Sequence, residues 1–446
     1  QMLSGWLFFF PPPPHHHQFF LSHLKEEQQT NPLFNLPVMS TTTHAAASVP
    51  QSIPAASLSP PSVPLEPLTP PCYTSSALAT ASPSSFISMQ SASDPSDSSF
   101  EGPEKKLEVD FCVDPDRPRG LRDVTEKQWS AMLRLAGCTI VSATSNAHMD
   151  SFVLSESSLF VYPFQVILKT CGTTTLLGAL PLLLQYARDL GLTLCFVVFC
   201  RKNYMFPHKQ IFPHTTFGTE VAQLSRHFKD AGSAYVLGPL TGDHWYLYTA
   251  DFRVKKATGE NDQTLEIMMT DLDPAVMRRF YRTPGLVGSK LTRDLGLQRL
   301  TVGLYEEEGD QVWETEAVTD EVLFDPCGYS LNGMLGRGYY TIHVTPEEQC
   351  SFVSFECNFA LASYAALARR VVEIFQPGKF SVTVFTDHQA PGIAAKHEFT
   401  DSTFEKFTMR HKTDYEFEGD YAACHIHYDA LKRSPQLYED NFMDTA

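Results

Sequence analysis

The sequence predicts an α+β fold from about residue 100 onward. Apolar runs of strand length occur there beside amphipathic stretches of helix length, and the strands are long enough for antiparallel pairing. The chain has 446 residues, of which 12% are aromatic, so one large domain or two ordinary ones can bury a sizeable core. We expect residues 96–446 to form the folded domain.

The expected elements follow in chain order. Residues 158–170 (SLFVYPFQVILKT) are mostly apolar, which predicts one buried strand. Gly172 then turns the chain into a helix expected over 173–190, where Pro181 predicts a kink or a break. Further strands are expected at 194–200, 339–344, 352–356 and 379–386, with a strand or hairpin at 234–252. Further helices are expected at 220–231, at 273–281 with Pro274 in the first turn, and at 358–375.

Residues 1–95 differ in composition from the rest of the chain. Pro, Ser, Thr and Ala dominate this segment, and charged side chains are rare before Asp94. A segment of this kind cannot bury enough apolar surface to offset the entropy lost on ordering. We therefore expect a disordered, low-complexity extension.

Charge and cysteine usage exclude several classes of protein. The net charge of -17 argues against a nucleic-acid surface, which needs clustered Lys and Arg, and it suits a cationic small ligand. The ten cysteines form no C-x-x-C pair, and no Cys/His set has zinc spacing, so we expect free thiols and no metal. No apolar run of the sequence approaches the ~20 residues of a membrane helix. A cytoplasmic protein without membrane contact is expected.

Five short motifs carry most of the chemical information: residues 100–108 (FEGPEKKLE), 154–159 (LSESSL), 169–174 (KTCGTT), 324–333 (FDPCGYSLNG) and 340–347 (YTIHVTPE). Taken singly, each has an ordinary structural interpretation; Cys171, for example, is typical of a small buried residue before a turn. Taken together and in this order, they resemble the eukaryotic S-adenosylmethionine decarboxylases. The resemblance covers roughly residues 99–390, and nothing is carried over beyond them.

The resemblance implies a four-layer α/β/β/α sandwich of two antiparallel sheets flanked by helices. It also implies a self-processing proenzyme, in which the Ser157 hydroxyl attacks the Glu156 carbonyl and Ser157 becomes a pyruvoyl group. Fragments 1–156 and 157–446 would then stay together in one fold. The pyruvoyl ketone would form a Schiff base with S-adenosylmethionine and accept the electrons left when CO₂ departs, without pyridoxal phosphate or a metal. The product is the aminopropyl donor for spermidine and spermine.

The resemblance assigns catalytic roles to several residues. Glu101 and Glu104 match active-site carboxylates that support processing and catalysis. Ser330 and His343 match the pair that assists pyruvoyl formation, with His343 as the base. Cys171 matches the proton donor that quenches the carbanion, and an ordinary thiol with a pKa of ~8.5 is largely protonated at neutral pH.

The substrate-binding residues are implied in the same way. Phe100 and Phe324 match the two aromatic rings that sandwich the adenine of the substrate. Glu347 matches the carboxylate that binds the ribose hydroxyls, and Glu156 is expected to contact the substrate as well. The family contains both dimers and monomers, so a homodimer of cleaved protomers stays open.

An acidic site for the activator putrescine is also implied. The matching residues are Glu108, Asp262, Thr264, Glu266 and Glu356, and strand alternation over 262–266 puts three of them on one face. Lys106 stands where animal members have an apolar residue and plant members have a basic one. We hypothesise that its ammonium supplies part of the activating charge, so that putrescine stimulation is modest. The alternative is that Lys106 extends to solvent.

Two rival functions remain at this point. A non-catalytic relative could bind a true decarboxylase, but such relatives typically lose processing or catalytic residues, and all of them are retained here. A thiol or serine hydrolase could use Cys171 or Ser330 with His343, and it would leave the chain uncleaved.

Overall fold

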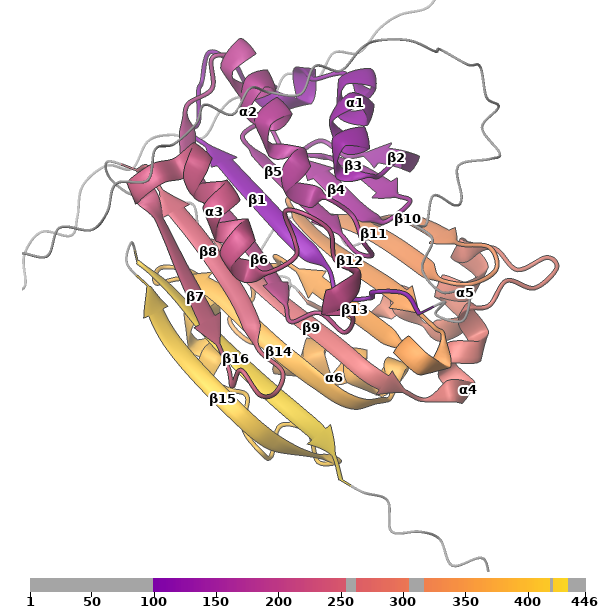
Figure 1. Ribbon diagram of the computed structural model, residues 1–446. Helices are drawn as coiled ribbons and strands as arrows, with labels where there is room; N and C mark the ends of the chain where they lie inside the picture. The colour runs from indigo at the N-terminus through magenta and orange to yellow at the C-terminus, as the bar shows by residue number, and fades with distance from the viewer. Residues whose placement is uncertain (1–98, 254–261, 305–316, 418–419, 432–446) are drawn as a thin grey trace, which may run out of the picture. The chain divides into compact units, whose positions relative to one another are not determined.

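The computed structural model describes residues 99–253, 262–304, 317–417 and 420–431 (Figure 1). The disordered extension predicted for residues 1–95 lies outside these ranges. The described residues form two antiparallel sheets of eight strands each. In spatial order, sheet A comprises β2 (Ile140–Ser145), β3 (Asp150–Leu154), β4 (Ser157–Val161), β5 (Gln165–Thr170), β1 (Lys105–Phe111), β6 (Leu194–Lys202), β8 (Trp245–Asp251) and β7 (Gly232–Leu237). Sheet B comprises β10 (Val318–Leu323), β11 (Tyr329–Leu335), β12 (Gly338–Thr345), β13 (Phe352–Cys357), β9 (Gln263–Leu272), β14 (Pro377–Asp387), β16 (Tyr421–Ala430) and β15 (Phe407–Phe417).

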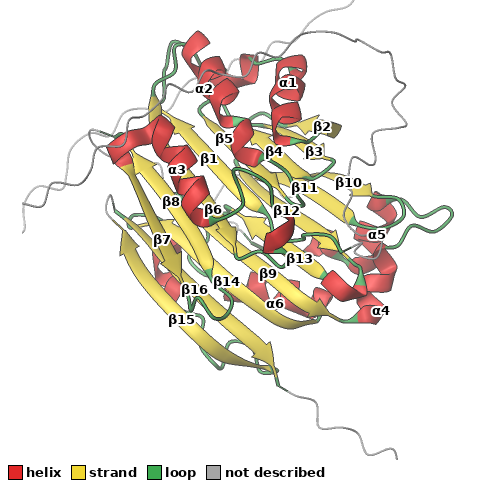
Figure 2. Ribbon diagram, viewed as in Figure 1, coloured by secondary structure: helices red, strands yellow, loops and turns green. Residues whose placement is uncertain are grey.

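Helices cover the outer face of each sheet, so the described chain has four layers (Figure 2). Sheet A carries α1 (Glu126–Ala136), α2 (Leu180–Asp189) and α3 (Phe217–Phe228). Sheet B carries α4 (Pro274–Met277), α5 (Gly288–Leu295) and α6 (Ala365–Phe375). This arrangement confirms the predicted α/β/β/α sandwich. No helix of the described ranges is long and apolar enough to cross a membrane.

Period-two alternation sorts the strand side chains between two environments. In β1, Leu107 and Val109 join the apolar core beneath the helices of sheet A, whereas Lys106 and Glu108 face the opposite sheet. In β12, Ile342 likewise joins the core beneath the helices of sheet B. The outer faces of the sheets therefore supply the two main hydrophobic cores, and the inner faces are free to carry polar groups.

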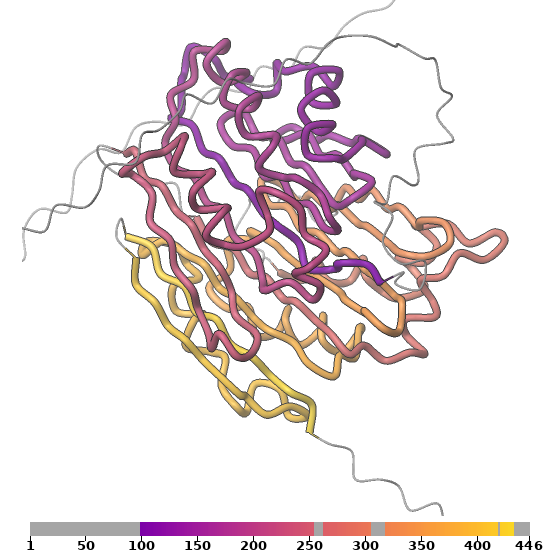
Figure 3. The backbone as a smooth tube through the Cα atoms, viewed as in Figure 1, coloured from indigo at the N-terminus to yellow at the C-terminus, as the bar shows by residue number. Residues whose placement is uncertain are grey.

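β1 has an unusual place in sheet A. It is the first strand of the described residues, yet it pairs with β5 on one side and with β6 on the other. Figure 3 shows this indigo strand between later strands of the same sheet. Consequently, residues 99–104, which precede β1, lead to the middle of sheet A instead of its edge.

The prediction of one continuous strand over 158–170 is wrong. The structure divides it into β4 and β5, joined by a tight hairpin in which Tyr162 N donates to Gln165 O at 2.8 Å. Both strands are buried, and the turn holds Tyr162 and Phe164 beside Pro163, so hydropathy does not drop at the turn. An apolar run without alternation therefore conceals a reversal of direction.

Two predicted helices start later than expected. The helix predicted over 173–190 begins at Leu180, and Pro181 lies in its first turn, where its missing N–H is not needed. The helix predicted over 358–375 begins at Ala365. Before it, the amide of Gln263 donates to the carbonyl oxygens of Phe359 and Leu361, both at 2.9 Å, and this holds the segment in an irregular path.

The remaining predicted elements are confirmed with small shifts in their ends. The strands predicted at 194–200, 339–344, 352–356 and 379–386 are β6, β12, β13 and β14. Residues 234–252 form the antiparallel β7–β8 hairpin, and the helix predicted at 220–231 is α3 followed by a short 3₁₀ turn. α4 begins at Pro274 after Asp273, whose carboxylate accepts from Ala275 N at 2.7 Å.

We expect deletion of residues 1–95 to leave the folded unit intact. Within the described ranges, the two main cores are built from residues between Leu107 and Tyr428, and we expect these to suffice for folding. The thermal midpoint should shift by less than about 2 °C, which corresponds to under ~1 kcal/mol for a domain of this size. Self-cleavage and turnover should change little. A large loss of turnover in the purified truncated protein would mean that the extension packs on this unit.

Candidate active site

A layer of buried polar side chains separates the two sheets at one end. Sheet A and its flank contribute Glu104, Lys106, Glu108, Ser158 and Lys169, and sheet B contributes Ser330, Asn332, Thr341, His343 and Glu356. Buried polar and charged groups are tolerated only when they are paired. The contacts among these residues therefore define the chemistry of the site.

Ser157 occupies the first position of β4, directly after a two-residue turn. Leu154 pairs with Ser157 across the β3–β4 hairpin, so Ser155 and Glu156 form the turn. Ser157 has a φ of +119°, a region that L-residues rarely adopt and that costs about 1–3 kcal/mol. The peptide bond between Glu156 and Ser157 thus lies at a strained point of the backbone.

His343 is surrounded by three serine hydroxyls. Its Nε2 lies 3.1 Å from Ser157 Oγ and 2.9 Å from Ser158 Oγ, and its Nδ1 lies 2.9 Å from Ser330 Oγ. The Ser157 hydroxyl also donates to Glu104 Oε1 at 2.9 Å. Burial lowers the pKa of His343 to about 4, so the ring is neutral at pH 7 and can accept a proton.

Cys171 contacts both the backbone carbonyl and the side-chain carboxylate of Glu156. The Cys171 N–H donates to the carbonyl oxygen of Glu156 at 3.1 Å, and its thiol lies 3.9 Å from Glu156 Oε2. Burial, with the nearby carboxylates of Glu156 and Glu104, raises the pKa of Cys171 well above its ordinary value. The thiol therefore keeps its proton, and the amide is placed to stabilise negative charge on the carbonyl oxygen.

At Gly172, the motif 169–174 comes into close contact with the motifs 100–108 and 154–159. Its φ is +64°, and a Cβ there would lie 3.2 Å from the ring of Phe100 and 3.3 Å from Glu156 Oε2. Its N–H donates to Glu101 O at 2.9 Å, and its carbonyl accepts from Lys105 Nζ at 3.0 Å. The close approach of these groups explains why a glycine stands at this position.

Glu101 is buried, whereas the adenosine-binding candidates Phe100, Phe324 and Glu347 are half-buried. The Glu101 carboxylate accepts from Met205 N at 2.8 Å and from Phe206 N at 2.7 Å. Phe100 and Glu347 are both half-buried, and Cys350 joins them, because it contacts Phe100 and donates its N–H to Glu347 O at 3.0 Å. Phe324 is half-buried in the turn after β10, where its N–H donates to Gly328 O at 2.9 Å.

A chain of alternating charges runs from the Ser157 region into the middle of the layer. Lys169 Nζ lies 3.5 Å from Glu104 Oε2 and 3.2 Å from Glu356 Oε2. Lys106 Nζ lies 3.3 Å from Glu356 Oε1 and 3.2 Å from Glu108 Oε2. Burial alone would raise the pKa of Glu356, but the two ammonium groups lower it to about 2.

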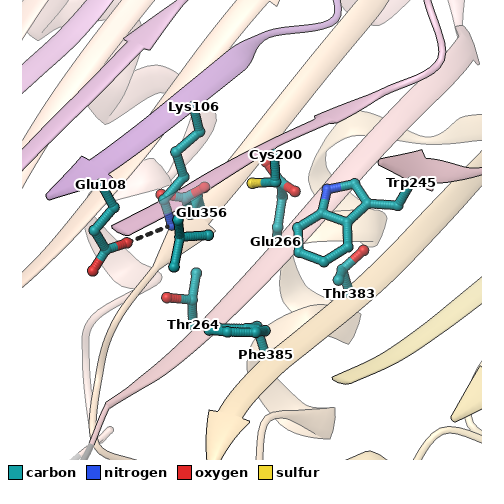
Figure 4. A pocket seen from close by; sticks show the side chains of 10 residues that line it. Lys106, Glu108, Cys200, Trp245, Thr264, Glu266, Glu356, Thr383 and Phe385 are labelled. Carbon is teal, nitrogen blue, oxygen red and sulfur yellow. Dashed lines mark ion pairs between the residues drawn. The ribbon is translucent and has the colours of Figure 1, made fainter. Parts of the chain in front are cut away.

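Lys106 fills much of the predicted putrescine site. Figure 4 shows its side chain between Glu108 and Glu356. A cavity of about 10 Å³, room for roughly one water, remains beside it. The lining of this cavity includes Thr264, Glu266 and Trp245. Lys106 is 5% exposed, so the alternative in which it extends to solvent is wrong.

The acidic residues of this site are not all neutralised by Lys106. Burial raises the pKa of Glu108 to about 7 and that of Glu266 to about 8. Asp262 does not line this cavity. Its carboxylate instead groups with those of Glu108 and Asp110, and each contributes one oxygen within 4.8 Å of the other two. This is the one group in the described ranges whose spacing suits a metal ion.

Several residues of the site escaped the sequence analysis. Lys169, Ser158 and Asn332 have no motif-based role, yet Lys169 bridges two carboxylates and Ser158 donates to Asn332 Oδ1 at 2.5 Å. Strand alternation could have placed all three on the inner faces. Tyr339, whose hydroxyl donates to Glu356, could not have been paired with it without the β12–β13 register.

Comparison with known proteins supports the same family. The sequence profile described as "Adenosylmethionine decarboxylase" matches residues 97–429. Three similar proteins are each named "S-adenosylmethionine decarboxylase proenzyme". The Dictyostelium discoideum protein is 39% identical over 371 residues, covering 81% of this chain and 93% of that protein. The Xenopus laevis protein is 42% identical over 298 residues, covering 65% and 84%, and the Leishmania donovani protein is 35% identical over 340 residues, covering 74% and 86%.

The family profile extends beyond residue 390, where the expected resemblance ended. It includes nearly all of β15 and β16, which complete sheet B without contributing a recognisable motif. The profile covers well over half of the chain, and relatives above 30% identity span most of it. The chain therefore belongs to the adenosylmethionine decarboxylase family.

Proposed function

We propose that this protein is a pyruvoyl-dependent S-adenosylmethionine decarboxylase that cleaves itself between Glu156 and Ser157. One observation carries the proposal. The Ser157 hydroxyl lies 3.1 Å from the neutral imidazole of His343, and the adjoining carbonyl already accepts a hydrogen bond from Cys171 N. A nucleophile, a base and an oxyanion donor thus meet at one peptide bond.

The proposed cleavage follows from this geometry. Ser157 Oγ attacks the carbonyl carbon of Glu156 after its hydroxyl turns from Glu104 Oε1 to His343 Nε2. His343, in the tautomer that carries its own proton on Nδ1 facing Ser330, takes the hydroxyl proton at Nε2, and the developing oxyanion faces Cys171 N–H. Collapse breaks the C–N bond, the Ser157 nitrogen takes the proton back, and an ester links the two residues. Loss of the Ser157 Cα proton then expels the Glu156 carboxylate. The dehydroalanine that remains tautomerises and is hydrolysed to pyruvoyl with release of ammonia.

The site fits a pyruvoyl group at position 157. That group would supply a ketone that binds the substrate amine and takes up electrons as CO₂ leaves. Cys171 then acts as the proton donor, because its raised pKa keeps the thiol protonated. Glu101 and Glu104 offer carboxylates to the cationic substrate. The half-buried Phe100, Phe324 and Glu347 would bind its adenosine.

The two fragments should remain associated after cleavage. Fragment 1–156 contributes β1, β2 and β3, whereas β4, β5 and β6 belong to fragment 157–446. β1 pairs on both sides with strands of the other fragment, and β3 pairs with β4. Separation would break three ladders and expose a hydrophobic core.

The thiol form of the rival hydrolase has less support. Ser330 Oγ does lie 2.9 Å from His343 Nδ1, so the serine form is decided by whether the chain is cleaved. Cys171 contacts Glu156, and among the described hydrogen bonds its thiol makes none with His343, so a Cys–His hydrolase is disfavoured. The nine described cysteines are free thiols, which supports a cytoplasmic location. A homodimer of cleaved protomers remains part of the proposal.

Replacing the proposed nucleophile should stop processing. Ser157→Ala should remain one chain on a denaturing gel, because no hydroxyl can attack the Glu156 carbonyl. His343→Ala should stall with the ester or the intact amide, and hydroxylamine should cleave a stalled ester. Two fragments and normal decarboxylation from Ser157→Ala would exclude a pyruvoyl group at this residue.

Cys171 should matter more for turnover than for cleavage. Cys171→Ala keeps the backbone N–H that faces the Glu156 carbonyl, so fragments should still form. Decarboxylation should slow by roughly 10²–10⁴-fold, the usual contribution of a positioned proton donor. The measurement is ¹⁴CO₂ release from carboxyl-labelled substrate, normalised to the cleaved fraction. Unchanged release at full cleavage would assign the proton to another group.

We further propose that Lys106 acts as a built-in activating cation. Its ammonium lies between two carboxylates matching the putrescine site, and the remaining space holds about one water. Through Glu356 it is one carboxylate removed from Lys169, which contacts Glu104. A continuous series of ion pairs therefore connects the Lys106 ammonium to Glu104, the carboxylate that accepts a hydrogen bond from Ser157.

Removing this charge should make the enzyme depend on putrescine. Lys106→Leu is expected to lower the basal rate and to increase the fold-stimulation by putrescine, whereas Lys106→Arg should resemble wild type. Initial decarboxylation rates with and without putrescine decide the matter. Equal basal rates and equal stimulation in wild type and Lys106→Leu would refute the idea.

A further inference from the structure

Two cysteines lie close together where the β1–β6 ladder ends, after the last residue of β1 and near the first residue of β6. Cys112 directly follows β1, and Cys195 is the second residue of β6. Asp110 pairs with Phe196 whereas Phe111 pairs with Leu194, so Cys195 is the extra residue of a β-bulge. Bulges turn a side chain away from the regular alternation, and here the bulged residue is a cysteine beside another cysteine.

The two thiols are neighbours and both are free. Cys112 follows Phe111, which pairs with Leu194, and its thiol is close enough to Cys195 to influence the pKa of that residue. Cys112 is exposed and Cys195 is half-buried, so a small reagent can reach them. The backbone fixes both: Cys112 N donates to Thr193 O at 2.8 Å, and Cys195 O accepts from Phe252 N at 3.0 Å.

We propose that Cys112 and Cys195 form a reversible disulfide that covalently joins the two fragments of the processed enzyme. The proposal rests on the cleavage proposed above, which places Cys112 in fragment 1–156 and Cys195 in fragment 157–446. Neither residue belongs to the polar layer between the sheets. The disulfide would lie at the end of the ladder that pairs β1 of one fragment with β6 of the other.

The chemistry requires a low-molecular-weight disulfide as oxidant. The Cys112 thiolate attacks one sulfur of oxidised glutathione, which releases one glutathione thiolate and leaves a mixed disulfide on Cys112. The Cys195 thiolate then attacks Cys112 Sγ and expels the second glutathione thiolate. Both cysteine protons pass to water or to the released thiolates, and two electrons reduce the glutathione disulfide.

The second step should be the slower one. Burial, together with the neighbouring Cys112 thiol, raises the pKa of Cys195 to about 12, so its thiolate is scarce at neutral pH. The exposed Cys112 is therefore the residue that meets the oxidant first. Closure should accelerate as the pH rises from 7 to 9, because the thiolate fraction of Cys195 increases.

The test compares reducing and non-reducing denaturing gels of the purified full-length protein after incubation with oxidised glutathione. We expect two fragments on the reducing gel and one species of full-chain size on the non-reducing gel. Dithiothreitol should restore the two fragments. Cys112→Ser and Cys195→Ser should each abolish the joined species, and Cys72→Ser, the matched control in the same fragment as Cys112, should retain it.

Two results would overturn the proposal. One is a pair of separate fragments with glutathione on Cys112 alone, which would mean that the thiols cannot close. The other is a joined species that persists in Cys195→Ser, which would mean that another thiol pairs with Cys112. Peptide mapping of wild type after alkylation identifies the linked pair without any substitution.

Failure of the cleavage itself would look different. The reducing gel would then show a single chain for wild type, as it should for Ser157→Ala. In that uncut variant, disulfide closure still lowers the intact mass by about 2 Da and links the same two peptides. The thiol chemistry and the self-cleavage are therefore judged by separate readings.

Discussion

The carboxylate of Glu356 lies between two ammonium groups of the opposite sheet, and the rest of the reaction centre depends on this arrangement. A charge taken out of water is tolerated only when a partner of opposite sign is held against it. Lys106 and Lys169 meet that requirement from neighbouring strands of sheet A, at 3.3 and 3.2 Å. Because Lys169 also contacts Glu104, the position of Glu356 is coupled to the carboxylate beside Ser157.

The strained backbone at Ser157 has a place in the proposed chemistry. Ladder pairing holds this residue on both sides, opposite Leu154 in β3 and opposite Thr170 in β5, so the positive φ cannot relax while the chain is intact. The φ angle of Ser157 is measured from the carbonyl carbon of Glu156, which the proposed cleavage detaches from the Ser157 nitrogen. The strain would therefore be released as the C–N bond opens, which favours the forward direction.

Motif order was sufficient to predict the family, the sheet-on-sheet architecture and the grouping of Ser157, Cys171 and His343. The order of the motifs could not predict the register in which the strands pair. Ser158 and Asn332 become partners only because β3, β4 and β11 come together across the layer, which no local pattern encodes. The hairpin inside 158–170 was missed for a related reason, because strands buried on both faces show no alternation to interrupt. The late start of α6 depends on a distant side chain, Gln263.

The insertion of β1 between β5 and β6 has a consequence for the lifetime of the molecule. An intact chain brings its strands together at the high effective concentration that a continuous backbone provides. Once the backbone is cut, reassembly from the unfolded state becomes a second-order encounter of two polypeptides, in competition with aggregation of each. The working enzyme would thus be able to fold only as its precursor, and its persistence afterwards is governed by the rate at which it unfolds.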